Sequence, residues 1–439
     1  MRLRRRVPAL LAGAALVAAI AALPATSGFA TTTYSAATAC SAPQWTEGVS
    51  YPAGSRVTYA SRMYQALVTH TPPAGAGWNP AATPALWTDV GPCDGSPSPS
   101  PTVPPTPPPT PTPTPTVPPD STTCPVKSKP TGKVLQGYWE NWDGAANGVH
   151  PPLGWIPITD SRIRAHGYNV LNAAFPVIRA DGTVLWEDGM DAGVKVPTPA
   201  EMCQAKAAGL TILMSIGGAT AGIDLSSGAV ADRFVATIVP ILKRYNFDGI
   251  DIDIETGLTG SGTINQLSAS QANLIRIIDG VLAQMPAGFG LTMAPETAYV
   301  TGGSVVYGSI WGAYLPIVKR YADNGRLWWL NMQYYNGSMY GCFGDSYPAG
   351  TVEGFTKQTD CLDTGLVVQG TTIRVPYDKQ VPGLPAQPGA GGGHLSPAAV
   401  AQAWNTYGGG LKGLMTWSLN WDGSKGWTFG DNVRNLQGR

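Results

Sequence analysis

The stretch "FDGIDIDIETG", residues 247–257, places four carboxylates in an otherwise apolar run: Asp248, Asp251, Asp253 and Glu255. Charged residues make up only 13% of the chain, so this concentration needs a physical reason. Side chains alternate between the two faces of a strand, which puts Asp251, Asp253 and Glu255 on one face and three isoleucines on the other. Asp248 is out of this register, and we expect it to cap the strand entry or to bond to backbone.

The C-terminal part of the chain, residues 124–439, alternates short apolar runs with helix-length segments. Two of these segments, 230–245 and 268–285, have helical periodicity. Repeats of a strand followed by a helix indicate an α/β fold with a parallel sheet. Eight such repeats indicate that the sheet closes into a (β/α)8 TIM barrel. A doubly wound open sheet is the alternative, but the chain has no Gly-rich phosphate loop. The eight predicted strands are 133–142, 168–175, 210–218, 247–255, 289–296, 328–336, 379–386 and 413–421.

Barrel active sites lie at the C-terminal ends of the strands, which places Glu255 at the mouth. Three carboxylates in a confined site cannot all ionise cheaply, so at least one should keep its proton near neutrality. A protonated Glu255 would then suit a general acid. The alternatives are a salt-bridged structural cluster and a divalent metal held by carboxylates. No predicted strand offers Lys or Arg at the same mouth, which argues against the salt-bridged cluster.

Aromatic and amide side chains gather at the ends of other predicted strands. Tyr138 and Trp142 end the first strand, residues 332–336 end another, and Trp417 ends the last. Rings beside carboxylates suit a neutral sugar, which offers flat C–H faces and many hydroxyls. An anionic substrate would need Arg or Lys here.

The N-terminus predicts export. Residues 1–30 combine four arginines, an apolar run and small residues, which is typical of a secretory signal peptide. A membrane anchor is the alternative, but the run is shorter than the roughly 20 residues that a span needs. We therefore predict a secreted, extracellular protein without a membrane partner. A formal net charge of +0 gives no electrostatic case for nucleic acid.

A Pro/Thr/Ser-rich segment, residues 94–123, predicts an extended linker between a small unit, residues 40–93, and the barrel. Turn residues between short strand-like runs predict a small all-β domain. Its aromatic residues could simply form the core, as we expect for Tyr64. Trp78 lies among Gly, Pro and Asn, where an exposed ring would suit stacking on a sugar.

The six cysteines are even in number, as expected of a disulfide-bonded exported protein. Segment boundaries favour pairing of Cys40 with Cys93 and of Cys342 with Cys361. This choice leaves Cys124 and Cys203, although other pairings remain open. The chain has no C-x-x-C and no His pair at ligand spacing, so we predict no metal and no cofactor.

These motifs resemble those of a known enzyme family. "DGIDIDIE", residues 248–255, matches the D-x-x-D-x-D-x-E signature of glycoside hydrolase family 18, and "SIGG", residues 215–218, matches its second signature. "LTMAPE", "MQYYN" and "MTWSLNWD" follow in the order that the family requires. Most members are chitinases, and the chain looks like the bacterial branch with few barrel insertions. The resemblance implies a secreted, endo-acting chitinase that cleaves β-1,4 bonds between N-acetylglucosamine units.

The resemblance also implies roles for individual residues. Glu255 would protonate the glycosidic oxygen and then activate water, while Asp253 orients the substrate N-acetyl group and shares charge with Asp251. Tyr335 would donate to the acetamide carbonyl, whose oxygen acts as the nucleophile in a retaining reaction. The other substrate contacts would be Trp417, Gln333, Asn336 and the weaker candidates Met293 and Tyr138, either of which could be core.

The small unit resembles carbohydrate-binding modules of families 5 and 12. The matching features are "CSAPQWTEGVSYPAGSRVTYASRMYQA" and "ALWTDVGPC". They imply chitin binding, with Trp78 and possible further contacts from Trp87 or Tyr64. We predict a monomer whose partners are chitin and chito-oligosaccharides. The alternatives are an endo-β-N-acetylglucosaminidase acting on N-glycans and a non-catalytic chitin-binding lectin.

Overall fold

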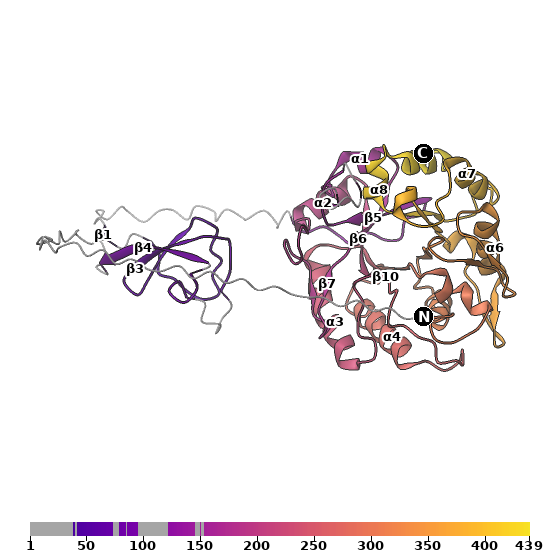
Figure 1. Cartoon of the computed structure of the whole chain (residues 1–439), viewed down its shortest axis with the longest axis horizontal. Coiled ribbons are helices and arrows are strands. Elements are labelled where there is room, and N and C mark those ends of the chain that lie inside the picture. The colour runs from indigo at the N-terminus through magenta and orange to yellow at the C-terminus, as the bar shows by residue number, and fades with distance from the viewer. Residues whose placement is uncertain are drawn as a thin grey trace, which may run out of the picture. The chain divides into compact units, whose positions relative to one another are not determined.

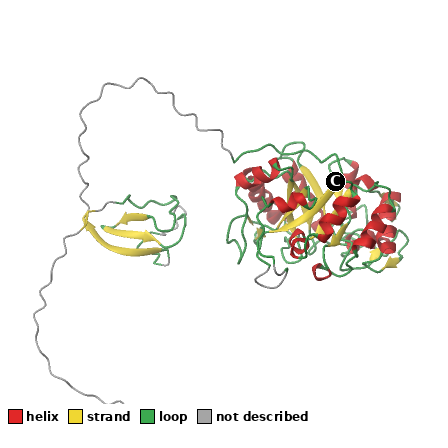
Figure 2. Ribbon diagram, turned by 90° about the horizontal axis from the view of Figure 1, so that it is seen from above, coloured by secondary structure: helices red, strands yellow, loops and turns green. Residues whose placement is uncertain are grey.

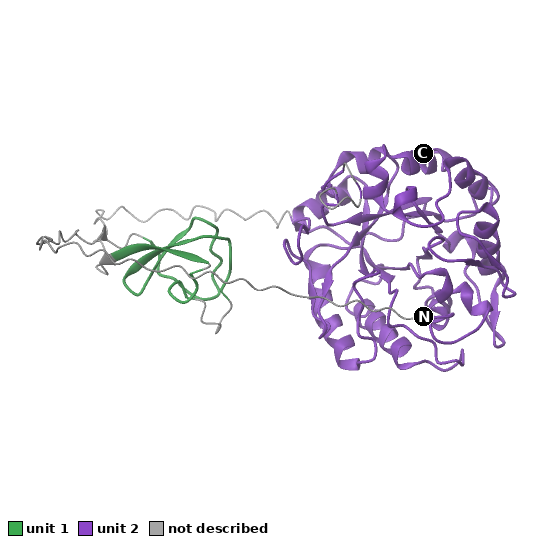
Figure 3. Ribbon diagram, viewed as in Figure 1, with its two compact units in different colours: residues 1–112 green, residues 113–439 purple. Residues whose placement is uncertain are grey.

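The computed structural model describes residues 38–39, 42–72, 79–84, 86–94, 122–144, 150 and 153–439. It divides into two compact units, residues 1–112 and 113–439 (Figure 3). The predicted signal peptide, most of the predicted linker, Cys40 and Trp78 lie outside the described residues. Within the described ranges, no helix is long and apolar enough to cross a membrane.

The N-terminal unit is all-β, as the sequence predicts. Its sheet has the strand order β1-β4-β3-β2. The hairpin between β2 and β3 turns through Ala60 and Ser61, whose φ angles are 48° and 57°. Positive φ at both positions is the geometry of a type I′ turn, whose twist matches that of the paired strands. The strands are β1 (Thr38–Ala39), β2 (Arg56–Tyr59), β3 (Arg62–Ala66) and β4 (Trp87–Asp94).

Two candidate sugar contacts belong to the core of this unit. Tyr64 is 5% exposed and Trp87 is 2% exposed, and both pack with Tyr51 and Val57. A small sheet has few large side chains with which to build a core, and here these two rings are used for it. The structure therefore confirms Tyr64 as a core residue and corrects the alternative expectation that Trp87 or Tyr64 contacts a sugar.

The C-terminal unit contains the eight parallel strands that the sequence predicts, and it is a TIM barrel (Figure 1). The sheet order is β12-β11-β10-β9-β6-β5-β18-β17. Parallel bridges from Leu330 to Gln380 and from Gln333 to Gly383 join the two edges, so the sheet closes on itself. The strands are β5 (Val134–Glu140), β6 (Val170–Ala174), β9 (Thr211–Gly217), β10 (Gly249–Asp253), β11 (Gly290–Met293), β12 (Trp329–Leu330), β17 (Gly383–Pro385) and β18 (Gly413–Trp417).

Helices surround these strands (Figures 1 and 2). Short hairpins pair β7 (Val177–Ile178) with β8 (Val184–Leu185), β13 (Met339–Tyr340) with β14 (Ser346–Tyr347), and β15 (Leu366–Val368) with β16 (Thr371–Ile373). The helices are α1 (Ser161–Ala165), α2 (Pro199–Ala207), α3 (Gly228–Arg244), α4 (Ala269–Leu282), α5 (Leu315–Asp323), α6 (Val352–Thr364), α7 (Pro397–Asn405), α8 (Leu419–Ser424) and α9 (Thr428–Leu436).

Local sequence explains the two helices that flank the acidic strand. The hydroxyl of Ser227 accepts a hydrogen bond from Val230 N at the start of α3, and Ser268 forms a capping box with Gln271 at the start of α4. Both helices bury apolar residues at helical spacing against the outside of the sheet. Ile250 and Ile252 of β10 belong to the same buried cluster. The isoleucine face of the strand therefore packs outward, as the alternation predicts.

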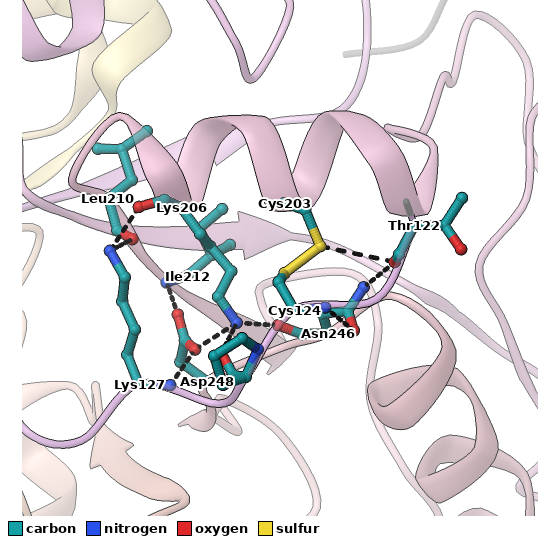
Figure 4. Close-up of polar contacts among 10 residues, drawn as sticks. Thr122, Cys124, Lys127, Cys203, Lys206, Leu210, Ile212, Asn246 and Asp248 are labelled. Atoms are coloured by element: carbon teal, nitrogen blue, oxygen red, sulfur yellow. Dashed lines mark hydrogen bonds and ion pairs between the residues drawn. A yellow bond between two sulfur atoms is a disulfide. The ribbon is translucent and has the colours of Figure 1, made fainter. Parts of the chain in front are cut away.

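Two disulfides follow the predicted pairing. Cys124 bonds to Cys203, and Cys342 bonds to Cys361. Cys40 of the predicted Cys40–Cys93 pair lies outside the described residues, and this pairing stays a prediction. The Cys124–Cys203 bond ties the segment that precedes β5 to helix α2, next to the entry of β10 (Figure 4).

A buried ion pair holds the entry of the acidic strand (Figure 4). Asp248 Oδ1 lies 2.7 Å from Lys206 Nζ, and both side chains are at most 3% exposed. Asp248 also accepts hydrogen bonds from the backbone N–H groups of Lys127 and Ile212, at 2.7 and 2.9 Å. Asp248 therefore caps the entry as predicted, and Lys206 is a counter-ion that the sequence does not reveal. Burial raises the pKa of Asp248, and the charge of Lys206 opposes that rise.

We expect Lys206→Met to lower the free energy of unfolding at pH 7 by about 3–5 kcal/mol, because it leaves a buried carboxylate without its counter-ion. The deficit should shrink as pH falls and Asp248 takes up a proton, since a raised folded pKa lets the native state bind that proton first. Denaturant unfolding of the full chain at pH 7 and pH 4 measures both effects.

Lys319→Met is the matched control, because Lys319 forms an exposed pair with Asp323 at 2.8 Å. It should change stability by less than about 1 kcal/mol. Equal losses in the two variants would contradict the role given to Lys206.

Candidate active site

Three carboxylates follow one another along the inward face of β10 and the residues after it. Asp251 is fully buried, Asp253 is 3% exposed and Glu255 is half-buried. Asp251 lies inside the barrel, and Asp253 and Glu255 line a cavity at its C-terminal end. The alternation predicted from sequence is therefore present over the whole acidic stretch.

Asp251 is held by four hydrogen-bond donors inside the barrel. Its Oδ1 accepts from Thr292 Oγ1 at 2.6 Å and Asn331 Nδ2 at 3.0 Å. Its Oδ2 accepts from Tyr138 Oη at 2.6 Å and Ser215 Oγ at 2.8 Å. Burial raises the pKa of Asp251, and these four donors oppose that rise because each favours the ionised form.

Gln333 connects the two outer carboxylates. Its Nε2 donates to Asp253 Oδ1 and to Glu255 Oε1, each at 2.9 Å. Burial, followed by the charges of Glu255 and Asp251, raises the pKa of Asp253 well above its usual range. Burial also raises the pKa of Glu255, and the hydrogen bond from Gln333 opposes that rise. A proton is therefore retained on this pair at pH values where isolated carboxyl groups are ionised.

The cavity at this end of the barrel has a volume of about 480 Å³. Its lining contains no Lys or Arg among the residues that the structure describes, so it offers no cation to an anionic ligand. No group of three His, Cys, Asp or Glu side chains suited to a metal occurs in the described ranges. The rings and acids of the lining are Trp142, Phe175, Tyr335, Trp417, Asp143, Asp191, Asp253 and Glu255.

Trp417 is the centre of an aromatic wall. Its ring stacks on Phe175 with centroids 6.0 Å apart and an interplanar angle of 17°. Trp142 and Tyr138 also contact it, at centroid distances of 6.3 and 5.4 Å. Trp417 remains partly exposed to the cavity, so a flat apolar surface faces the carboxylates. This combination of a ring surface and acceptors suits a neutral sugar.

The structure brings most of the predicted site residues together. Those that line the cavity are Asp253, Glu255, Gln333, Tyr335, Asn336 and Trp417. Tyr138 lies beneath it, 1% exposed, with its hydroxyl on Asp251. Met293 does not reach the cavity, because Thr292 and Ala294 point into the barrel and Met293 points to the helix-facing cluster. The structure corrects the expectation that Met293 contacts substrate.

Sequence reasoning missed several lining residues. Phe175 directly follows β6, so the rule that barrel sites lie at strand ends would have indicated it. Asp191 and Ala390 lie in long connections, where no periodicity points to the cavity. Thr292 and Asn331 were missed as donors to Asp251, because their inward orientation depends on the closed barrel.

Comparison with known proteins identifies the family. The family model "Glycosyl hydrolases family 18" matches residues 134–283. "Endochitinase 4" of Metarhizium robertsii is 81% identical over 312 residues, which is 71% of this chain and 90% of that protein. The chain belongs to glycoside hydrolase family 18.

Other relatives of this family-18 chain cover more of its length. "Chitinase Chi52" of Paenibacillus xylanexedens is 31% identical and covers 89% of this chain and 91% of that protein. The crystal structure of a family GH18 chitinase from Chromobacterium violaceum has 27% identity and a TM-score of 0.61, covering 91% of this chain and all of that one. Because relatives occur in fungi and bacteria, the bacterial branch stays a prediction.

The N-terminal unit of this family-18 chain also matches a family. Residues 44–88 match the model of carbohydrate-binding module family 5/12, as the sequence resemblance implies. The match lies within the all-β unit and includes Trp78, which is outside the described residues.

We expect Thr292→Val to lower the free energy of unfolding by about 1.5–3 kcal/mol, because it removes one donor from the buried Asp251 carboxylate while nearly preserving volume. Denaturant unfolding measures the loss. Thr371→Val is the control, since Thr371 makes an exposed hydrogen bond to Asn265 at 3.1 Å and its removal should cost less than about 0.5 kcal/mol. Similar values for the two variants would mean that the Asp251 network contributes no special stability.

Proposed function

We propose that this protein is a secreted, endo-acting chitinase that hydrolyses β-1,4 bonds between N-acetylglucosamine units. The observation that carries the proposal is the half-buried Glu255, which faces an aromatic cavity and shares one amide donor with Asp253. No Lys or Arg lines that cavity in the part of the chain that the structure describes. The names of the relatives support the activity and the endo mode. The family 5/12 module supports a polymeric substrate.

In the proposed reaction Glu255 is the general acid. Burial raises the pKa of its carboxyl, which favours the protonated form that can give a proton to the glycosidic oxygen. When the bond breaks, Glu255 becomes the carboxylate that takes a proton from the attacking water. Gln333 then stabilises the ionised form through its 2.9 Å hydrogen bond.

The nucleophile in this proposal belongs to the substrate. A conventional retaining enzyme needs an acid and a nucleophilic carboxylate on opposite sides of the anomeric carbon, and Asp253 and Glu255 project from one strand in one direction, which suits them poorly to those two roles. The acetamido oxygen of the sugar would attack the anomeric carbon instead, forming an oxazolinium ion as the glycosidic bond breaks and the leaving oxygen takes the proton of Glu255. Water would then open this ion, and the two displacements together give net retention of configuration. Asp253 would orient the acetamido N–H, and Tyr335 would donate to its carbonyl. Asp251 does not reach the cavity, so it acts as a positioning residue through its charge on Asp253.

The remaining lining residues would bind the sugar. Trp417 offers its ring to the apolar face of the sugar at the cleavage point. Asn336 has its Oδ1 fixed by Gly392 N at 2.8 Å, and its amide N–H₂ group can donate to a sugar hydroxyl. Export through the predicted signal peptide, action as a monomer and chitin binding through Trp78 are parts of the same proposal.

We expect Glu255→Gln to lower kcat on chito-oligosaccharides by at least about 10²–10⁴-fold while chitin binding is retained, because the amide keeps its shape but has no proton to give. Product release over time, followed by mass spectrometry, and a chitin sedimentation assay measure the two properties. A wild type that releases no sugar would indicate the lectin. Faster release of intact N-glycans than of chito-oligomers would indicate the endo-β-N-acetylglucosaminidase.

Glu296 tests the source of the nucleophile. It is half-buried, burial raises its pKa, and its charge acts on both Asp253 and Glu255, yet it lies outside the proposed machinery. We expect Glu296→Gln to keep most of the wild-type kcat on the same oligosaccharides. Near-total loss of turnover, with an intact fold by circular dichroism, would favour a conventional carboxylate nucleophile.

A further inference from the structure

A buried polar cluster, made of Glu140, His150 and Ser418, lies next to the aromatic wall and is not used in the proposed mechanism. Glu140 Oε1 accepts a hydrogen bond from Ser418 Oγ, and Glu140 Oε2 lies 2.7 Å from His150 Nε2. The side chains of Glu140 and His150 are 0% exposed, and Ser418 is fully buried.

The hydrogen bonds fix where the protons lie. His150 Nδ1 is 2.8 Å from the carbonyl oxygen of Leu153, which can only accept, so Nδ1 carries a hydrogen. Ser418 Oγ accepts from Trp421 N at 3.1 Å, so its own hydrogen is free to bond to Glu140. Glu140 Oε2 and His150 Nε2 have no other partner among the described residues. Two bare acceptors at 2.7 Å would repel each other, so one of these two atoms carries a proton.

The cluster joins segments that carry residues of the cavity. Glu140 ends β5, and Trp142 lies two residues later in the cavity wall. Ser418 directly follows Trp417. A Cβ atom on Gly144 would lie 2.1 Å from His150 Nε2, so the backbone of Gly144, two residues after Trp142, packs directly on the imidazole.

A second tie connects the same segments. Glu140 N donates to Asn420 Oδ1 at 2.9 Å, which links the end of β5 to helix α8. Trp142 and Trp417 are themselves in contact, with ring centroids 6.3 Å apart. A change in the cluster would therefore be transmitted to both indole rings.

We propose that the Glu140–His150–Ser418 cluster is a positioning element that holds Trp417 and Trp142 for sugar binding and releases them when the shared proton is lost. The inference rests on the proposed function, because it assigns these two rings to substrate binding. His150 acts through the tryptophans and touches no substrate.

The direction of the pH effect follows from the charges around His150. Burial alone would lower the pKa of His150, but the hydrogen bond and charge of Glu140 outweigh burial and raise it. The ion pair between His150 and Glu140 is therefore fully formed below the ordinary histidine pKa. It is lost as the pH rises through the raised pKa of His150 in the folded protein. The other acids on the adjoining segments are Asp143, in the loop after β5, and Asp422 of α8. The carboxylate of Asp422 accepts hydrogen bonds from Tyr168 Oη and from the backbone N–H groups of Phe429 and Gly430.

The test separates KM from kcat across pH 5–9 on soluble chito-oligosaccharides, using the full chain. For the wild type we expect KM to rise about tenfold on the alkaline side, equivalent to about 1.4 kcal/mol of lost binding. In His150→Gln, the side-chain amide does not titrate and can still donate an N–H to Glu140. The KM of this variant should therefore not change with pH and should stay close to the KM of the wild type at acidic pH. His150→Ala should have the raised KM already at pH 5, with kcat nearly unchanged.

His166→Gln is the matched control, because His166 pairs with Asp431 at 2.9 Å and does not line the cavity. It should follow the wild-type profile. A wild-type KM that does not change with pH, or one that changes equally in His150→Gln, would overturn the proposal. If His150→Ala does not fold, the wild-type and His150→Gln profiles still decide. A wild type that cleaves no oligosaccharide would refute the proposed function instead.

Discussion

A carboxylate placed inside a closed barrel must receive hydrogen bonds from the strands around it, because no water is available to solvate its charge. Asp251 meets this condition with donors from β5, β9, β11 and the end of β12. Each donor has to project inward at the same depth, so the relative register of four strands is set by one side chain. The positions of Asp253 and Glu255 follow, since they stand on the same strand face closer to the mouth.

The distribution of protons over the site follows from this placement. Asp251 is compensated by four donors, whereas Asp253 shares only the amide of Gln333 with Glu255 and is subject to three like charges, those of Glu255, Asp251 and Glu296. The cost of ionisation is therefore concentrated at the outer pair, next to the cavity. When two neighbouring titratable groups have different environments, their pKa values differ, so one can donate a proton while the other stays ionised and stabilises charge. Here a single strand provides both environments.

The sequence predicted the barrel well because its strands are short apolar runs separated by helices with clear periodicity. It also placed the acidic face, since one acid at every second residue leaves little freedom in a strand. It failed for Met293, because the run around it is apolar or small on both faces and gives no period-two signal. Lys206 was also missed as the counter-ion of Asp248. Nothing in its helical sequence distinguishes it from a surface lysine, and only the folded chain brings it to Asp248. Trp87 was misplaced, and Tyr64 was assigned to both the core and the sugar contacts, because an aromatic residue in a small β unit can serve the core or the surface equally well.

The closure of the barrel has a consequence for its local stability. β12 has two residues and β17 has three, and they meet through isolated bridges, with Val381 N bonded to Leu330 O and Gly383 N to Met332 O at 2.9 Å. A seam this short has few hydrogen bonds to break together, so transient opening should start there and amide protons along it should exchange with solvent early. Gln333 lies on that seam. The side chain that donates to both Asp253 and Glu255 therefore belongs to the part of the barrel wall where we expect local opening to start.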